Sequence, residues 1–286
     1  MKTKIVKKPD KVLTNDEILQ HPNEVKAAIK AELALWIKYG IMSRTAWTGA
    51  RNIVTSRFVY EWKVVDGTKT IRARLVLHGF KDLTKEDTDT YAGTASRTSQ
   101  RMLVSEAALH PDWVFATTDI SKAFLQGMTY KEISQQTGDP EKIMHFTLPK
   151  GCDQILATFK GFEGYSERWE VLRCQRPGTG TVDAPRSFSL MLKSILIKLG
   201  WRETSVDAEL LIHFTDKLNG VMSVHVDDIK IAAEKSLFHL TTHNLEIRFG
   251  KLTITLDNFV NTGVRHRRLP NGDIILDQHE YVKGLG

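Results

Sequence analysis

Two adjacent aspartates, Asp227 and Asp228, interrupt a largely apolar, β-prone run over residues 221–233. Burying either carboxylate as an ion without a partner would cost several kcal/mol. Their mutual repulsion adds about 4 kcal/mol at about 4 Å when the effective dielectric constant is about 20. A turn between two strands relieves both penalties, because it lets the carboxylates project toward a divalent cation. Since oxygen ligands suit Mg²⁺, the pattern predicts a β-hairpin with a metal-binding tip.

A third acid, Asp119, ends another predicted strand over residues 113–119, which is rich in aromatic and β-branched residues. Residues 120–127 read as a short helical turn that a glycine closes. Three carboxylates in one small volume can hold two metal ions about 3.5–4 Å apart, an arrangement that stabilises the attacking and leaving oxygens of phosphoryl transfer. The alternative is three surface acids in turns, where aspartate is common.

Four sequence blocks occur in an order typical of one protein family. They are Arg72-Ala-Arg-Leu-Val-Leu-His-Gly-Phe80, Thr118-Asp-Ile-Ser-Lys-Ala-Phe-Leu-Gln-Gly127, Asp183-Ala-Pro-Arg-Ser-Phe188 and His225-Val-Asp-Asp-Ile229. In this order and spacing they resemble the reverse transcriptase of copia-type LTR retrotransposons. The resemblance runs from about residue 57 to the end of the chain, and more weakly through the amino-terminal helix.

This resemblance implies an α+β fold of the right-hand polymerase type, with fingers, a palm of antiparallel sheet backed by two helices, and a short thumb. Hydrophobic periodicity alone indicates only a mixture of α and β structure. The implied subdivision is a basic tail over residues 1–13, an amino-terminal helix and fingers over 14–112, a palm over 113–251 with a fingers insertion at about 128–180, and the primer grip and start of the thumb over 252–286.

Local patterns predict the individual elements. A capping box at Thr14 opens a short helix that is broken at Pro22. A longer helix with Trp36 on its apolar face ends at Gly40. The other expected elements are strands over 58–65 and 70–77 around an Asp-Gly turn, and helices over 98–110, 185–199 and 237–249.

The resemblance also implies an RNA-directed and DNA-directed DNA polymerase, a nucleotidyltransferase that extends a primer with deoxynucleoside triphosphates on an RNA or DNA template. Asp119, Asp227 and Asp228 match the family's metal-binding acids, and the backbone carbonyl of Ile120 would complete the shell of one ion. Two Mg²⁺ ions are the expected cofactors, with Mn²⁺ able to substitute. One would activate the primer 3′-hydroxyl, and the other would hold the triphosphate.

Four side chains are further candidates for nucleotide contact. Phe124 matches an aromatic residue that crowds the sugar and selects deoxyribose by leaving no space for a 2′-hydroxyl; a core phenylalanine at a helix start is the alternative. Arg72 and Arg74 share one face of the predicted hairpin that also carries Lys63. These cations could donate charge-assisted hydrogen bonds to the β- and γ-phosphates, or they could form a solvated cationic face.

Template and primer contacts are implied in three segments. Residues 176–186 match the loop and helix start that pack on the template and the incoming base, and glycines there let the backbone approach a ligand closely. Thr179-Gly-Thr-Val-Asp183 and His225 depart from the family pattern, losing a ring and a cation in the loop and a tyrosine before the paired acids, so we expect impaired activity. Residues 265–268 could contact the primer backbone or form a solvated strand end. The implied contacts are Gly180, Ala184, Pro185, Arg186, His225, Val226 and, in the primer-grip turn, Gly263.

Composition agrees with these expectations. The 286 residues carry a net charge of +6 and have a pI of about 9.2, which suits a polyanionic partner. Cys152 and Cys174 are too few and too far apart for a disulfide scaffold or a cysteine zinc site and suit a reducing compartment. His239 and His243 lack a third ligand and are expected on a helix surface. We find no membrane span or export signal. The resemblance implies an intracellular protein, in cytoplasmic virus-like particles, the nucleus or both.

Two alternatives to a polymerase stay open. A degenerate or domesticated copy would bind nucleic acid without polymerising, which the departures at His225 and residues 179–183 favour. A two-metal nuclease would use the same acids, although the order of the blocks disfavours it. Family members lie in a polyprotein with protease, integrase and ribonuclease H. Because none of those motifs is visible here, we expect no cleavage of the RNA strand by this chain.

Overall fold

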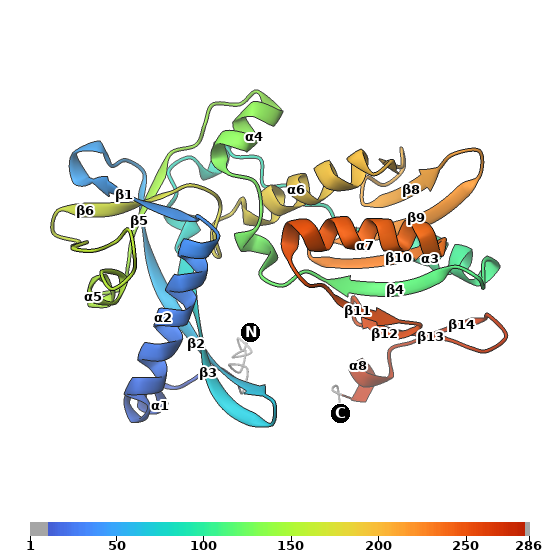
Figure 1. Ribbon diagram of the computed structural model, residues 1–286, viewed down its shortest axis with the longest axis horizontal. Coiled ribbons are helices and arrows are strands. Elements are labelled where there is room, and N and C mark those ends of the chain that lie inside the picture. Colours follow the sequence, from blue (N-terminus) through green and yellow to red (C-terminus); the bar gives the residue numbers. More distant parts are fainter. Residues whose placement is uncertain (1–10, 284–286) are drawn as a thin grey trace, which may run out of the picture. The chain divides into compact units, whose positions relative to one another are not determined.

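The computed structural model describes residues 11–283, which divide into two compact units. The first unit includes the residues up to Thr90 together with Met128–Ser187, and the second includes Tyr91–Gly127 and the residues from Phe188 onward. Both units combine sheets and helices (Figure 1), so the α+β class expected from the sequence is confirmed. The assignment of fingers, palm and thumb stays a prediction.

Two helices, α1 (Asn15–Gln20) and α2 (Pro22–Lys38), open the first unit. The expected capping box is formed, because the Thr14 hydroxyl accepts from the Glu17 N–H and the Glu17 carboxylate accepts from the Thr14 N–H at 2.8 Å. Pro22 occupies the first turn of α2, where its missing N–H needs no partner. α2 packs along the strand β3 (Thr68–Leu77) and buries Trp36 completely, as its apolar face predicts.

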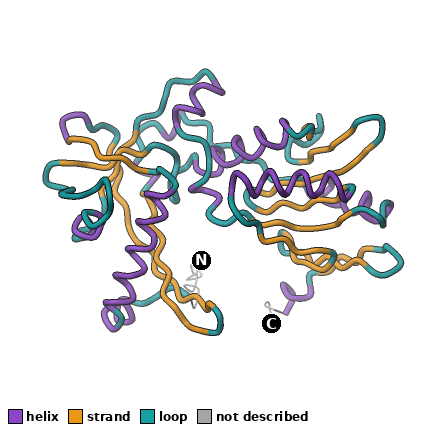
Figure 2. Tube along the Cα trace, viewed as in Figure 1, coloured by secondary structure: helices purple, strands orange, loops and turns teal. Residues whose placement is uncertain are grey.

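A five-stranded sheet in the order β1-β6-β5-β2-β3 is the framework of the first unit (Figure 2). β2 and β3 form a long antiparallel hairpin around Asp66 and Gly67, whose φ values of 49° and 76° suit a type I′ turn. β2 begins before the expected residue 58 and pairs there in parallel with β5. The elements are β1 (Met42–Ala46), β2 (Ile53–Val65), β3 (Thr68–Leu77), β5 (Met144–Thr147), β6 (Glu170–Cys174), α4 (Tyr130–Thr137) and α5 (Cys152–Leu156).

The basic tail expected over residues 1–13 falls mainly outside the described residues. Its last three residues are part of the fold, which corrects the expected boundary. Val12 forms a β-bridge with Glu61, the Lys11 carbonyl accepts from the Trp62 N–H at 2.7 Å, and Leu13 is buried. These contacts pair residues 11–13 with β2 instead of leaving them in solvent.

The second unit is built on a six-stranded antiparallel sheet in the order β11-β4-β10-β9-β8-β7. Helices α6 and α7 share a core with Ile229 and Ile231 on one face, and Figure 1 shows α7 lying along the strands. The two helices expected behind an antiparallel sheet are therefore present. The elements are β4 (Val114–Asp119), β7 (Trp201–Glu203), β8 (Leu210–Phe214), β9 (Leu218–His225), β10 (Asp228–Ala233), β11 (Thr253–Leu256), α6 (Ala184–Lys198) and α7 (Lys235–Phe249).

The opposite face of this sheet carries a third helix, α3 (Arg97–Leu109), and a second core around Phe115. The implied subdivision groups α3 with the fingers, whereas the helix packs in the second unit. A three-stranded sheet and a short helix complete the unit, and His239 and His243 lie exposed on α7 as expected. None of the helices within residues 11–283 has the length and hydropathy to cross a membrane. The last elements are β12 (Asn258–Asn261), β13 (Val264–Arg268), β14 (Ile274–Asp277) and α8 (His279–Lys283).

Candidate active site

Strands β4 and β10 bring the acid triad (Asp119, Asp227 and Asp228) together. Asp228, the first residue of β10, is the cross-strand partner of Asp119, the last residue of β4. Asp227 precedes Asp228 in the two-residue turn between β9 and β10. Two acids that are 109 positions apart in the sequence (228 minus 119) are therefore direct neighbours in the sheet.

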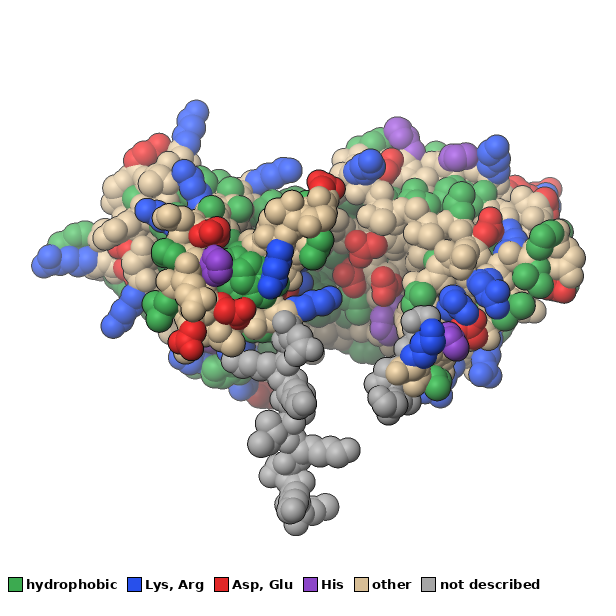
Figure 3. Space-filling view, turned by 90° about the horizontal axis from the view of Figure 1, so that it is seen from below, with side chains coloured by type: hydrophobic (Ala, Val, Ile, Leu, Met, Phe, Trp, Pro, Cys, Tyr) green, Lys and Arg blue, Asp and Glu red, His purple; other side chains and the backbone are tan. Residues whose placement is uncertain are grey.

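Asp119 and Asp228 project from the sheet face that α3 covers. Side chains alternate between the two faces along a strand. On β10, Ile229 belongs to the core beneath α6 and α7. Ala232 lies an even number of positions from Asp228, so the two share a face, and Ala232 belongs to the core beneath α3. On β4, Phe115 belongs to the core beneath α3, and Asp119, four residues later, lies on the same face of the strand. In the space-filling view, a group of acidic side chains lies near the middle of Figure 3.

Burial and neighbouring negative charge destabilise the ionised forms of Asp119 and Asp228. Burial and then the charge of Asp227 raise the pKa of Asp119 above its usual value. Burial, Asp227 and Asp119, in that order, raise the pKa of Asp228, and His225 lowers it by a smaller amount. A cation between the carboxylates would remove this repulsion.

The donor set suits Mg²⁺, which prefers carboxylate oxygens. Within residues 11–283, however, no three His, Cys, Asp or Glu side chains are already arranged to hold a metal ion. Mg²⁺ is commonly held by one or two carboxylates, waters and substrate phosphates instead of a cage of protein ligands. The pair of Asp119 and Asp228 therefore fits Mg²⁺, although the compact cluster of three acids expected from the sequence is not preformed.

The turn that carries Asp227 is strained. Val226 has a φ of 58°, in the left-handed region where β-branched residues are outliers. It is the first of two turn residues between the paired His225 and Asp228, the position that glycine takes in a type II′ turn. Such a conformation costs about 1–3 kcal/mol and persists only where its surroundings hold it. Pairing of β10 with both β9 and β4 provides that support.

The residues after Asp119 anchor the end of β4. Ile120 is almost fully buried in the core beneath α6 and α7. The expected helical turn is a 3₁₀ helix, Ala123–Leu125, entered through Lys122 at a φ of 59°. Phe124 lies in it and is half-buried, so its ring is neither a fully enclosed core side chain nor a fully solvated one.

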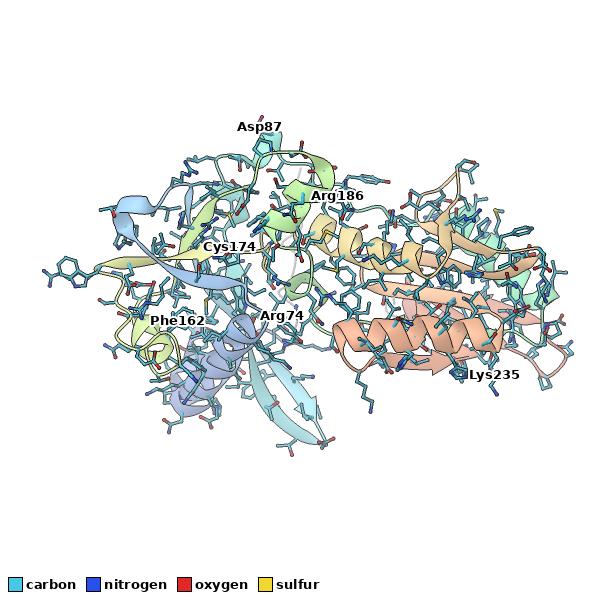
Figure 4. All side chains as sticks on the ribbon, turned by 45° about the horizontal axis from the view of Figure 1, so that its top comes forward. Arg74, Asp87, Phe162, Cys174, Arg186 and Lys235 are labelled. Carbon is cyan, nitrogen blue, oxygen red and sulfur yellow. The ribbon has the colours of Figure 1, made fainter. Side chains whose placement is uncertain are left out.

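The cations expected at the nucleotide belong to the first unit. Arg72 lies opposite Glu61 in the β2–β3 hairpin, and Arg74 forms an ion pair with Glu61 at 3.4 Å while its side chain is 44% exposed. Lys63 is exposed on the neighbouring strand. Arg74, labelled on β3 in Figure 4, is therefore accessible to a polyanion and only weakly held by its present partner.

The glycines of the 176–186 loop bring the loop close to the protein itself. A Cβ on Gly180 would collide with the carbonyl oxygen of Leu77, and a Cβ on Gly178 would lie 2.7 Å from the Trp36 ring. The Leu77 N–H donates to the carbonyl of Thr179 at 2.8 Å. The loop backbone therefore approaches β3 and α2 closely, whereas the sequence predicts a close approach to a ligand. At the start of α6, Ala184 is buried, Pro185 is half-buried, and Arg186 (Figure 4) pairs with Asp89 at 3.0 Å.

Asp183, in the segment that departs from the family pattern, is held by a lysine that the sequence does not single out. The Nζ of Lys142 lies 2.8 Å from Oδ2 of Asp183 and 2.6 Å from Oδ2 of Asp82, and these side chains are 11%, 5% and 1% exposed. Burial alone would lower the pKa of Lys142, but the two carboxylates raise it above its usual value. Lys142 and Asp183 are 41 residues apart, so no local pattern links them.

The expected primer-grip turn is the hairpin between β12 and β13, with Thr262 and Gly263 at φ values of 50° and 76°. Arg265 pairs with Asp277 of β14 at 3.0 Å. Arg268 is 10% exposed and donates to two backbone carbonyls at 2.7 Å, which gives it a structural role. Of the basic residues in this strand, Arg268 is therefore not free to contact a primer.

The expected site residues are divided between the two units. The first unit contains Lys63, Arg72, Arg74, Gly180, Ala184, Pro185 and Arg186. The second unit contains the acid triad with Ile120, Phe124, His225, Val226 and Gly263.

No protein-family model matches this chain. It is 27% identical over 238 residues, 82% of its length, to "Retrovirus-related Pol polyprotein from transposon RE1" of Arabidopsis thaliana. It is 23% identical over 240 residues, 83% of its length, to the corresponding polyprotein from transposon RE2 of the same plant. The chain spans 14% of the length of each relative.

A solved structure of apo telomerase from Candida tropicalis, truncated from the C-terminal domain, aligns with a TM-score of 0.44 and 8% identity, covering 88% of this chain and 60% of the telomerase chain. The two sequence matches are to retrovirus-related Pol polyproteins of transposons. They confirm the resemblance that the four sequence blocks indicate.

Proposed function

This chain is a relative of the retrovirus-related Pol polyproteins of transposons, and on that premise we propose that it is the reverse-transcriptase part of such a polyprotein. Its reaction would be DNA synthesis on an RNA or DNA template, by extension of a primer 3′-hydroxyl with deoxynucleoside triphosphates. The observation that carries the proposal is the pairing of Asp119 with Asp228 beside Asp227. Adjacent carboxylates at strand ends suit metal-dependent phosphoryl transfer.

In this proposal the acid triad and the backbone carbonyl of Ile120 would hold Mg²⁺. When bound, Mg²⁺ would lower the pKa of the primer hydroxyl and neutralise charge on the triphosphate. The protein's own part is to hold the backbone positions of the three acids close together. The β4–β10 pairing fixes Asp119 and Asp228, and the strained turn at Val226 fixes Asp227.

The remaining candidates would contact the substrates. The second unit would act as the palm, the β2–β3 hairpin as fingers, and the β12–β13 turn at Gly263 as the primer grip. His225 and Val226 would lie at the primer terminus. The 176–186 loop departs from the family pattern, but Asp183 has a buried ion pair there, which supports an intact loop instead of a decayed one.

One assay separates this proposal from its alternatives. The full chain is incubated with Mg²⁺, deoxynucleoside triphosphates and a labelled primer on an RNA template. Primer extension that EDTA abolishes would support the polymerase. Primer shortening would support a nuclease, and a gel shift without extension would support the degenerate copy that the replacement at His225 favours.

Arg74→Glu should raise the KM for the nucleotide by about ten-fold or more, because a charge-assisted contact to phosphate is worth about 1.5–3 kcal/mol. Steady-state incorporation kinetics measure this change. Lys69→Glu is the matched control, since Lys69 lies on the opposite face of β3 and packs over the Trp62 ring at 4.1 Å. Equal KM values for the two variants would favour a solvated cationic face.

Phe124→Ala should raise the use of ribonucleotides relative to deoxynucleotides by about ten- to a hundred-fold, because a steric exclusion of this size is worth about 1–3 kcal/mol. The ratio of kcat/KM for paired nucleotides measures the effect. Phe124→Tyr keeps the ring and should keep the selectivity. If sugar selectivity is unchanged in Phe124→Ala, the half-buried ring has only a packing role.

A further inference from the structure

A cavity of about 590 Å³ lies in the second unit. Its walls come from α3, β10 and the sheet of β12, β13 and β14, and none of the acid triad is among its described lining residues. The volume is that of a site for a small molecule. His225 and Thr262 also line the cavity, which places it beside the triad but separate from it.

The most buried charge in this cavity is Lys230. The residue is 2% exposed, and its Nζ lies 2.6 Å from Oε1 of Gln100 and 3.2 Å from Nε2 of His266. Nδ1 of His266 lies 3.0 Å from the Val264 carbonyl and donates to it, so Nε2 is the acceptor for Lys230. Both partners are neutral, and no carboxylate within residues 11–283 forms an ion pair with Lys230. A buried ammonium group normally has a counter-charge.

The rest of the lining increases the positive charge. Arg97 and Arg101 are exposed on the first turns of α3, where the helix dipole also favours an anion. Asp277 also lines the cavity, but its carboxylate is already paired with Arg265 at 3.0 Å. Leu276 and neighbouring valines provide an apolar wall. The cavity thus combines an uncompensated buried cation with space for an apolar body.

We propose that this cavity binds a small organic phosphate. The phosphate would accept hydrogen bonds from Lys230 and from the arginines at the rim, and the apolar body would pack against Val104 and Leu276. Lysine binds phosphate as a point charge and arginine as a fork, so both residue types suit this ligand. The bound phosphate supplies the counter-charge that Lys230 lacks, and binding requires no metal ion.

The test uses the full chain in EDTA and three probes, measured by isothermal titration calorimetry. Phenyl phosphate should bind saturably, inorganic phosphate more weakly, and phenol not measurably. Lys230→Met should weaken phenyl phosphate binding by about ten-fold or more, because a charge-assisted contact is lost. Lys217→Met is the matched control, since Lys217 is an exposed lysine of the same unit and does not line the cavity.

Lys230→Met should fold, because methionine replaces a buried charge with an apolar side chain, and urea unfolding checks this. If that variant does not fold, Arg101→Gln tests the same site from an exposed position. Weaker phenyl phosphate binding in either folded variant supports the proposal. Three results overturn it: no saturable binding by the unmodified chain, phenol binding as tight as that of phenyl phosphate, or unchanged affinity in the folded variants.

Discussion

Asp119→Asn and Asp227→Asn should each slow primer extension by about a thousand-fold or more, which corresponds to about 4 kcal/mol of transition-state stabilisation. Asparagine keeps the size of the side chain but removes the charge that would hold Mg²⁺. The fold should not be weakened, because burial and Asp227 already raise the pKa of Asp119, so the ionised form is disfavoured in the folded protein. Single-nucleotide incorporation and urea unfolding on the same samples measure both effects.

Asp112→Asn is the matched control for these variants. Asp112 is an exposed aspartate just before the other end of β4, so the same charge is removed close to the same strand but away from the triad. Its extension rate should be unchanged. A primer-extension rate close to that of the unmodified chain in Asp119→Asn would contradict the two-metal proposal. Parallel losses of rate and of unfolding free energy would instead assign the acids a structural role.

Lys142→Met should lower the free energy of unfolding of the first unit by about 3–5 kcal/mol, because it leaves Asp82 and Asp183 buried without their shared cation. Burial raises the pKa of Asp82, but hydrogen bonds from Lys142, Asn52 and Thr84 lower it overall from 3.8. The stabilisation from this group is therefore present above pH 3.8 and is lost as the pH falls through the lower folded value. Urea unfolding at a series of pH values should show that the unfolding free energies of Lys142→Met and the unmodified chain differ less in acid.

Lys217→Met is the matched control for the stability prediction. It breaks the Lys217–Glu234 pair of 2.7 Å, in which the lysine is 69% exposed, and should change stability little. Combining Lys142→Met with Asp82→Asn and Asp183→Asn should recover much of the lost stability, because no unpaired buried charge remains. If Lys142→Met is as stable as Lys217→Met, the buried cluster contributes no net stability.

Features with local causes could be predicted from the sequence. The turn at Asp66-Gly67 follows from two residues that tolerate positive φ, and the acidic hairpin follows from paired charges inside a β-prone run. The 3.6-residue period alone predicts Trp36 on the buried face of its helix, where the residue lies. Asp119 and Asp228 then become neighbours if the two predicted strands pair, as they do.

Features that depend on packing between distant segments could not be predicted. Arg268 reads as a surface cation, yet its guanidinium is buried on the carbonyls of a different segment. Lys230 is buried because α3 covers that face of the sheet, and nothing in the β10 sequence specifies which face is covered. The strain at Val226 could not be predicted either, because a valine before an aspartate does not indicate a left-handed turn position.

Because β4 pairs with β10 in one register, the position of Asp119 depends on the number of residues in β4. Loss of one codon within β4 keeps the reading frame, and Phe115 would still hold the start of the strand in its core. Because strand side chains alternate, Asp119 would then turn toward the apolar layer beneath α6 and α7. Such a deletion would leave the other residues of the chain unchanged but would remove Asp119 from the acid triad.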